Sequence, residues 1–213
     1  MAINEPTPFA FQKLRIFIDF WNFQLALNDV VHPGYRPDWK KFPLWLMQQA
    51  AILIPSGSLS NLQFEGTHVY LSFDPKSAKE SKLREWATNT LNRFPGVQVT
   101  CRERKWKSPP TCQSCHQEIG QCPHCGSAVL RTIEKGIDTA IVTDMIKLAW
   151  EDAWHIAILV SSDRDFIPAV EFLSAKGHKV INAGFSPRGF ELARTCWASI
   201  DLTSHTTEFE RLD

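Results

Sequence analysis

The sequence predicts an α/β fold with a mostly parallel sheet. Short apolar runs, dense in Ile, Val and Phe, alternate along the chain with longer stretches whose apolar residues recur every three or four positions. The apolar runs are nearly continuous, which is typical of strands covered on both faces. The length of 213 residues suffices for one such domain with a small inserted module.

The expected strands are the short apolar runs. The first, KLRIFIDF, is dense in Ile and Phe and too short for a helix, and the third ends in a basic stretch. In chain order the expected strands are residues 13–20, 67–73, 97–106, 154–160, 178–183 and 198–202.

The stretches between the strands carry helix signals. Ser77 is a candidate N-cap, Pro43 and Pro168 stand near helix starts, where proline is tolerated, and Gly177 is a stop signal. The expected helices are residues 38–54, 77–94, 135–151, 166–176 and 187–196. Residues 55–61 are expected to form a Ser/Gly loop.

One segment interrupts this alternation. Residues 107–130 are poor in core residues and rich in Cys, Pro and Gly, so we interpret them as an insertion. The predicted organisation is an α/β domain over residues 13–202, the inserted module at 107–130, and a polar tail at 203–213 that is expected to fray.

Composition excludes several classes of protein. The 23 Lys and Arg residues balance the 23 Asp and Glu residues, so the chain as a whole does not attract nucleic acid or anionic membranes. A polyanionic partner would need a local basic patch or metal ions. No apolar run is long enough to span a membrane, and the first residues lack the pattern of a signal peptide. We therefore expect a cytoplasmic protein whose cysteines are reduced or metal-bound.

Acidic residues follow the expected strands. Asp19 ends the first strand, Asp163 and Asp165 follow the fourth, and Asp138 starts the helix that leads into the fourth. If these two strands are neighbours, the carboxylates converge where parallel sheets bind ligands. Crowded carboxylates repel one another, and Mg²⁺ or Mn²⁺ would compensate and could activate water at a phosphodiester. The alternative is that these aspartates are ordinary turn and cap residues.

Four segments of the chain together resemble a known family. They are IDFWN (18–22), KGIDTAIVTDM (135–145), LVSSDRDFIPAV (159–170) and KGHKVINAG (176–184). In order and spacing they resemble NYN domain proteins of the LabA-like kind, which belong to the PIN-like nuclease superfamily. The resemblance runs over residues 13–202 and is interrupted by the insertion.

The resemblance implies a Rossmann-like (PIN-like) three-layer domain and cleavage of RNA by metal-activated water. By motif match it implies Mg²⁺ or Mn²⁺ ligands and one neighbouring site residue, Asn22; the implied ligands are Asp19, Asp138, Asp163 and Asp165. Asp144 matches a second helix aspartate. It lies about 240° around the helix from Asp138, so we treat it as a supporting residue. Ser162 stands where many members have glycine.

The insertion contains two CxxC pairs. Cys112 and Cys115 form the first pair, and Cys122 and Cys125 form the second, six residues further on. Four thiolates at this spacing predict one structural Zn²⁺ with no open coordination position. Disulfides, a redox CxxC pair, or ligation by the neighbouring histidines 116 and 124 are the alternatives.

Basic residues flank the insertion. We take them as candidate RNA contacts, together with one tryptophan that could stack on an unpaired base. They are Arg102, Arg104, Lys105, Trp106, Lys107, Arg131 and Lys135. The alternative is a solvated edge strand whose charges prevent aggregation.

The sequence thus favours a metal-dependent endoribonuclease that acts on single-stranded RNA or structured loops, with no membrane partner. The alternative is a non-catalytic module that binds RNA or protein through the zinc insertion. A homodimer or a protein partner at the insertion also remains open. An aspartyl-phosphate phosphatase is disfavoured, because Phe20 and Trp21 follow Asp19 where a second aspartate would be expected.

Overall fold

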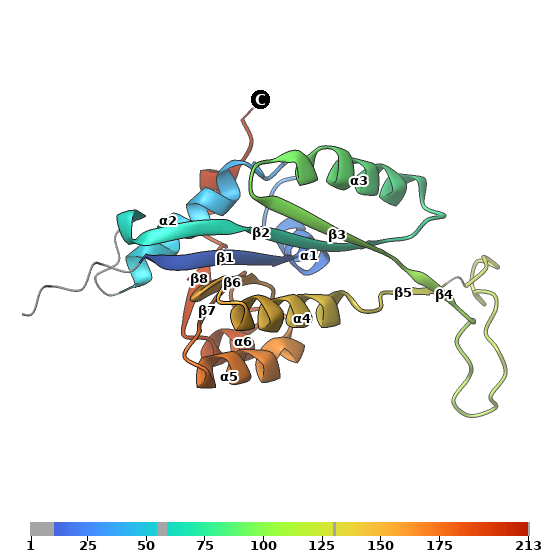
Figure 1. Cartoon of the computed structure of the whole chain (residues 1–213). Coiled ribbons are helices and arrows are strands. Elements are labelled where there is room, and N and C mark those ends of the chain that lie inside the picture. Colours follow the sequence, from blue (N-terminus) through green and yellow to red (C-terminus); the bar gives the residue numbers. More distant parts are fainter. Residues whose placement is uncertain (1–10, 55–58, 130, 213) are drawn as a thin grey trace, which may run out of the picture.

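Six strands form one parallel sheet in the order β3-β2-β1-β6-β7-β8 (Figure 1). The computed structural model describes residues 11–54, 59–129 and 131–212, without the side chains of Ser60 and Arg131. Part of the expected loop, residues 55–58, lies outside this range. The sheet strands are β1 (Gln12–Asp19), β2 (Leu62–Phe73), β3 (Val97–Glu103), β6 (Ile156–Val160), β7 (Lys179–Gly184) and β8 (Ala198–Asp201). The predicted α/β fold with a mostly parallel sheet is confirmed.

Helices cover both faces of the sheet and make a three-layer domain (Figure 1). One layer contains α1 (Phe20–Asn28), α2 (Lys41–Leu53) and α3 (Ala78–Asn89), and the other contains α4 (Ile137–Trp150), α5 (Ile167–Ala175) and α6 (Phe190–Thr195). Successive strand side chains point to opposite faces. Ile16 and Ile18 of β1 therefore enter the first core, while Phe17 enters the second.

Helix α1 was not expected from the sequence. It follows β1 without a loop, because the last strand residue is also the helix N-cap: the Asp19 side chain accepts a hydrogen bond from the backbone N–H of Asn22. The strand therefore delivers Asp19 directly to the carboxyl edge of the sheet, with a helix start just beyond it.

The expectation of a fraying C-terminal tail is wrong for residues 203–212. Phe209 lies in a short 3-10 turn (Thr206–Phe209) and is fully buried, with ring centroids 4.7 Å from Phe42 and 5.1 Å from Trp45. Its carbonyl accepts a hydrogen bond from Asp38 N–H at 2.7 Å. One large aromatic side chain anchors an otherwise polar segment, because its burial offsets the ordering entropy.

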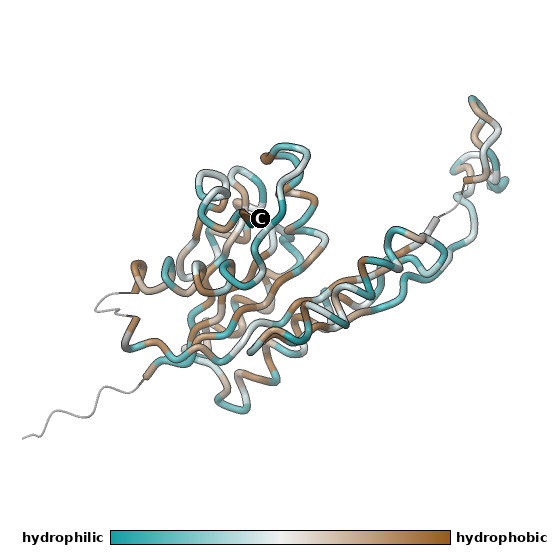
Figure 2. Tube along the Cα trace, turned by 90° about the horizontal axis from the view of Figure 1, so that it is seen from above, coloured by the Kyte–Doolittle hydropathy of each residue, from teal (hydrophilic) through white to brown (hydrophobic). Residues whose placement is uncertain are grey.

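The insertion is carried on a two-stranded antiparallel ribbon. The strands β4 (Lys105–Lys107) and β5 (Arg131–Ile133) continue from β3 and lead into α4. Both views show the ribbon projecting from the end of the sheet, with the cysteine loops at its far tip (Figures 1 and 2). The chain thus leaves the domain and returns to it at adjacent points.

Within the residues that the structure describes, no helix has the length and apolar character needed to cross a membrane.

Candidate active site

The carboxyl ends of β1 and β6 lie side by side and bring Asp19 next to Ser161. The two strands pair in parallel, with Ile18 opposite Val160. The Asp19 carboxylate accepts hydrogen bonds from the Asn22 N–H and from the Ser161 hydroxyl, both at 3.3 Å. Asp19 is only 5% exposed. The two strands whose adjacency the sequence analysis took as a condition are therefore neighbours, and they build this edge.

The loop after β6 is held by a series of side-chain to backbone hydrogen bonds. The Ser161 hydroxyl accepts from Asp163 N–H at 3.1 Å, and the Asp163 carboxylate accepts from Asp165 N–H at 2.9 Å. Asn22 Oδ1 accepts from Ser162 N–H at 2.8 Å. Asn22 thus fixes the loop that carries the two aspartates, and the Ser161 hydroxyl links that loop to Asp19.

Asp138 stands in the first turn of α4, within electrostatic reach of the β6 loop. Burial raises the pKa of Asp138, and the charges of Asp163, Glu134 and Asp165 raise it further. Gly136, with φ of 81°, starts this helix in a left-handed conformation that a side chain would strain. The turn directs the helix start, and Asp138 with it, toward the other carboxylates.

The Asp19 carboxyl has the most perturbed titration in this cluster. Burial is the largest cause that raises its pKa to about 7, and Asp138 and Glu134 add to it. Hydrogen bonds from Asn22 and Ser161 act in the opposite direction. At neutral pH the Asp19 carboxyl is therefore only partly ionised, and a nearby positive charge would favour its charged form.

Glu134 is a member of this cluster that the sequence analysis missed. It precedes the KGID segment, and its only sequence signal is a carboxylate just before the turn that starts α4. Its side chain accepts a hydrogen bond from the Ser72 hydroxyl at the end of β2. Glu134 therefore extends the acidic edge from β1 and β6 to β2.

Arg104, a predicted RNA contact, is already engaged within the protein. Its Nε donates to the Ser72 hydroxyl at 2.9 Å, its Nη1 lies 3.3 Å from Glu80 Oε1, and its guanidinium covers the Trp21 ring at 5.0 Å. Through these contacts Arg104 connects the base of the ribbon to the end of β2 and to helices α1 and α3.

Trp106 is half-buried, and Lys76 covers one face of its ring at 4.2 Å. The other basic flank residues are exposed: Arg102, Lys105, Lys107 and Lys135. The Arg102 guanidinium lies against Gly136, where an added Cβ would be 3.3 Å from Nη1. A cation therefore stands close to the start of α4. The Arg131 side chain lies outside the described residues.

Asp144 lies apart from the acidic edge. The Tyr70 hydroxyl donates a hydrogen bond to it at 2.8 Å, between α4 and the sheet. Six residues, about 1.7 turns of helix, separate it from Asp138, and the contact ties α4 to β2.

The two CxxC loops have the same backbone design. In the first loop Cys112 N–H donates to Gln117 O and Cys112 O accepts from His116 N–H. In the second, Cys122 makes the equivalent bonds with Ser127 and Gly126. The residue after the second cysteine is left-handed in both loops, with φ of 57° at His116 and 70° at Gly126. The chain thus forms two matching knuckles, and in each of them a hydrogen bond links the two free thiols.

Among residues 11–54, 59–129 and 131–212, the side chains as they lie include no group of three or more His, Cys, Asp or Glu with the spacing of metal ligands.

A parallel three-layer fold with carboxylates gathered at the carboxyl edge of its central strands defines an α/β domain with an acidic site at the end of its sheet. Residues 13–203 match the NYN domain family, and the chain belongs to it. NYN domains belong to the PIN-like nuclease superfamily; they are generally ribonuclease-like hydrolases that act on RNA and are typically metal-dependent.

A crystal structure of a protein of unknown function from Vibrio parahaemolyticus has a similar fold. The TM-score is 0.56 at 16% sequence identity, and the match covers 99% of this chain and 100% of the other. This likeness shows the fold alone. No curated protein matches the chain.

Proposed function

We propose that this protein is a metal-dependent endoribonuclease whose active site is the acidic edge of the sheet. The observation that carries the proposal is the crowding around the buried Asp19, whose pKa rises to about 7 beside Asp138 and Glu134. The helix-capping contact of Asp19 with Asn22 and its bond from Ser161 account for one buried carboxylate, but not for the other carboxylates around it, which a divalent cation makes favourable.

The donor set suits Mg²⁺ or Mn²⁺, because it consists of carboxylate oxygens, and such ions usually keep several water ligands. We assign the ion to Asp19, Asp138, Asp163 and Asp165, with Glu134 as a further acidic group. When bound, the metal supplies an activated water and stabilises charge on the phosphodiester in flight.

The residues around the carboxylates act by holding them in place. The backbone N–H groups of Asn22 and Asp165 fix the carboxylates of Asp19 and Asp163, and the Ser161 hydroxyl couples these two segments. Such preorganisation lowers the cost of bringing the acidic groups to one phosphate.

Exposed cations at the end of β3, on the projecting ribbon and just before α4 are suited to hold the RNA backbone. We assign this role to Arg102, Lys105, Lys107 and Lys135, and a structural role to Arg104, because its guanidinium is already occupied by Glu80 and Ser72. Phosphate contacts of this kind position a nucleic acid without reading its sequence.

We further propose that residues 107–130 form a separate module within the domain of residues 13–202. A structural Zn²⁺ on Cys112, Cys115, Cys122 and Cys125 would organise it. The matching knuckles support this, because each brings two free thiols together, and the two knuckles supply the four thiolates of such a site. Their chemistry selects Zn²⁺, while the oxygen-only acidic edge does not.

The test is cleavage of a labelled, structured RNA by purified protein with Mn²⁺, Mg²⁺ or EDTA. Asp163→Asn removes a proposed ligand. The matched control is Asp152→Asn, because Asp152 is an exposed aspartate that precedes β6 and pairs with Lys13 at the opposite edge of the sheet. We expect metal-dependent cutting by the wild type and by Asp152→Asn, and none by Asp163→Asn.

Equal cutting by both variants would indicate a contaminating nuclease or a different site. If folded wild-type protein binds RNA but does not cut it with either metal, the non-catalytic binding module replaces the nuclease as the better reading.

A further inference from the structure

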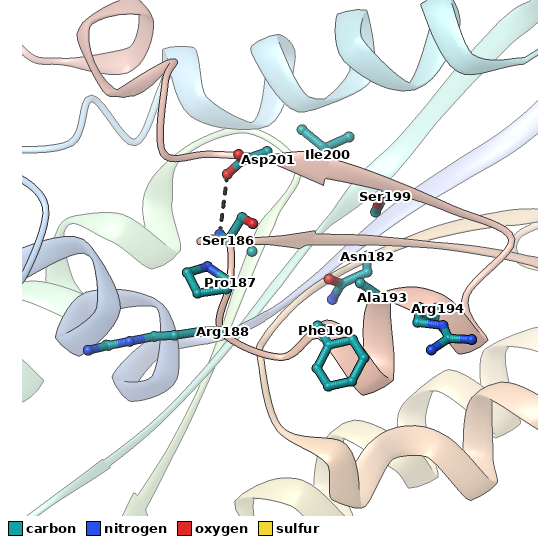
Figure 3. Close-up of a pocket in the computed structure, with 11 residues that line it drawn as sticks. Asn182, Ser186, Pro187, Arg188, Phe190, Ala193, Arg194, Ser199, Ile200 and Asp201 are labelled. Carbon is teal, nitrogen blue, oxygen red and sulfur yellow. Dashed lines mark hydrogen bonds between the residues drawn. The ribbon is translucent and has the colours of Figure 1, made fainter.

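A second recess lies beside the acidic edge, between the carboxyl ends of β7 and β8 and helix α6. Its volume is about 260 Å³. Pockets for drug-sized ligands measure about 300–1,000 Å³, so this recess suits a smaller group. Figure 3 shows Asn182, Ser199 and Asp201 along the two strands, with Phe190 and Arg194 on the helix side.

The recess shares a wall with the proposed active site. The Asn182 amide nitrogen donates to the Ser161 carbonyl at 2.8 Å. The hydroxyl of the same serine donates to the Asp19 carboxylate. On the other side, a Cβ at Gly184 would be 3.4 Å from the Ser162 hydroxyl. A group bound in the recess would therefore be a close neighbour of a phosphodiester at the acidic edge.

The strand side of the recess presents hydrogen-bond acceptors. Asn182 is only 3% exposed, and its amide nitrogen is committed to the carbonyls of Leu159 and Ser161. That orientation leaves Oδ1 toward Gly184, and no described residue donates a hydrogen bond to it. Asn182 lines the recess, so this oxygen is an acceptor that a ligand bound there can use.

Asp201 adds a second acceptor. Its Oδ1 accepts from Ser186 N–H at 3.3 Å and from Thr203 N–H at 2.9 Å. Partial burial acts to raise the pKa of Asp201, but these hydrogen bonds and nearby His205 outweigh it and lower the pKa. The carboxylate is therefore ionised at neutral pH and repels phosphate, while it attracts N–H donors.

The helix side presents a flat aromatic surface. The Phe190 side chain is 56% exposed, and the Arg194 guanidinium lies 6.0 Å from its ring centroid. Arg188 extends away from the recess and pairs with Asp29 at 2.6 Å (Figure 3). An exposed ring next to an arginine is a common platform for an unpaired base.

We propose that this recess binds one unpaired nucleobase of the RNA substrate, next to the phosphodiester that is cut. The base stacks on Phe190 and donates an amino group to Asn182 and Asp201. Adenine and cytosine carry such amino groups, whereas uracil presents carbonyl oxygens at the equivalent position. The inference rests on the proposed function, because it places the base relative to the acidic edge.

The test measures binding of short labelled oligoadenylate, oligocytidylate and oligouridylate to an Asp163→Asn background without added metal. Phe190→Ala should weaken oligoadenylate binding by about tenfold or more, which is the effect of losing one base–aromatic stack. Phe190→Trp should restore it. Phe172→Ala is the matched control, since Phe172 is an exposed phenylalanine on α5 with Lys176 four residues later.

Oligoadenylate and oligocytidylate should bind more tightly than oligouridylate, and Asp201→Asn should reduce the difference. Equal binding of all three would overturn the assignment of the acceptors. If Phe190→Ala binds like Phe172→Ala while the wild type still cuts RNA, the recess holds no base and the nuclease proposal stands alone.

Two further outcomes separate the possible sources of the base. Free adenosine monophosphate that binds in a Phe190-dependent way, without any effect of Phe190 on RNA binding, would overturn the RNA assignment. Wild-type protein that neither cuts nor binds RNA would overturn the proposed function and this inference together.

Discussion

Asn22 Oδ1 accepts a hydrogen bond from Ser162 N–H at 2.8 Å, and this contact joins the start of α1 to the loop after β6. Asn22→Ala leaves a partly buried N–H without its partner. We expect it to lower the free energy of unfolding by about 1–3 kcal/mol and to slow RNA cleavage. Urea unfolding and cleavage rates on the same preparation check this.

Asn28→Ala is the control for that variant, because Asn28 ends the same helix, is exposed, and accepts a side-chain hydrogen bond from Gln24 on the same helix. It should leave cleavage unchanged. A normal cleavage rate for Asn22→Ala would show that the loop keeps its place without this contact.

Gly189 packs directly on the same loop. A Cβ there would be 2.6 Å from Ser162 Cα, and the backbone φ is 67°. Gly177 is also left-handed, with φ of 89°, but faces open space. Gly177→Ala should cost about 1–2 kcal/mol from the backbone alone. Gly189→Ala should cost about 1–3 kcal/mol more and also slow cleavage, because it displaces Ser162. If both variants lose the same free energy of unfolding in denaturant, the loop accommodates the added Cβ at Gly189 at no extra cost.

The raised pKa of Asp19 makes stability depend on pH. Its folded-state value of about 7 exceeds the ordinary value of 3.8, so the folded protein holds this proton more tightly than the unfolded chain. Without metal, the contribution of the Asp19 carboxyl to the free energy of unfolding is therefore greatest below about pH 4 and is lost as the pH rises to about 7. The loss is at most about 4 kcal/mol.

Asp19→Asn removes that dependence. The variant should be more stable than metal-free wild type near pH 8, and the difference should vanish near pH 4. Adding Mn²⁺ near pH 8 should raise the Tm of the wild type more than that of the variant. A metal-free wild type that gains stability from pH 4 to 7 relative to Asp19→Asn would contradict the assignment.

Arg104 and Lys105 are adjacent cations with different expected roles. Arg104→Met breaks the contacts to Ser72 and Glu80, so it should destabilise the protein to unfolding by about 1–3 kcal/mol. Lys105→Met should leave stability unchanged and weaken RNA binding, with the salt dependence reduced by about one phosphate contact. Binding measured across salt concentrations distinguishes them. The reverse pattern would assign the phosphate contact to Arg104.

The cysteine loops should hold one Zn²⁺ per chain. Cys115→Ser and Cys125→Ser should lose the metal and open residues 107–130 to protease, while the central sheet stays folded. Cys101→Ser is the control, because Cys101 lies half-buried on β3. Elemental analysis and limited proteolysis provide the readouts. Full zinc content in both knuckle variants would exclude the four-thiolate site.

The alternation of strands and helices was sufficient to predict the parallel sheet, while the adjacency of β1 and β6 entered only as a condition. Given that adjacency, the proximity of Asp19 to the β6 loop follows, because parallel strands end at the same edge of the sheet. Helix α1 was missed because its cap is the last residue of a strand, which leaves no loop signal between them. The polar composition of residues 203–213 concealed the anchoring effect of Phe209.

Other parts of the site depend on contacts between distant residues, which local patterns do not reveal. Arg104 is one of several basic residues in that segment of the sequence. Only the fold shows that its guanidinium pairs with Glu80 and donates to Ser72. Glu134 joins the acidic edge through Ser72, 62 positions away. The recess at Phe190 exists only where β8 and α6 pack beside each other, so it cannot be recognised from either segment alone.

The ribbon pairs Lys107 with Arg131, so the insertion begins and ends at neighbouring points. Chain inserted between such points adds length without changing the path of the strands on either side. We therefore expect the domain to tolerate a shortened or exchanged insertion between these two points. Substrate choice could diverge in this way while the sheet and its carboxylates remain as they are.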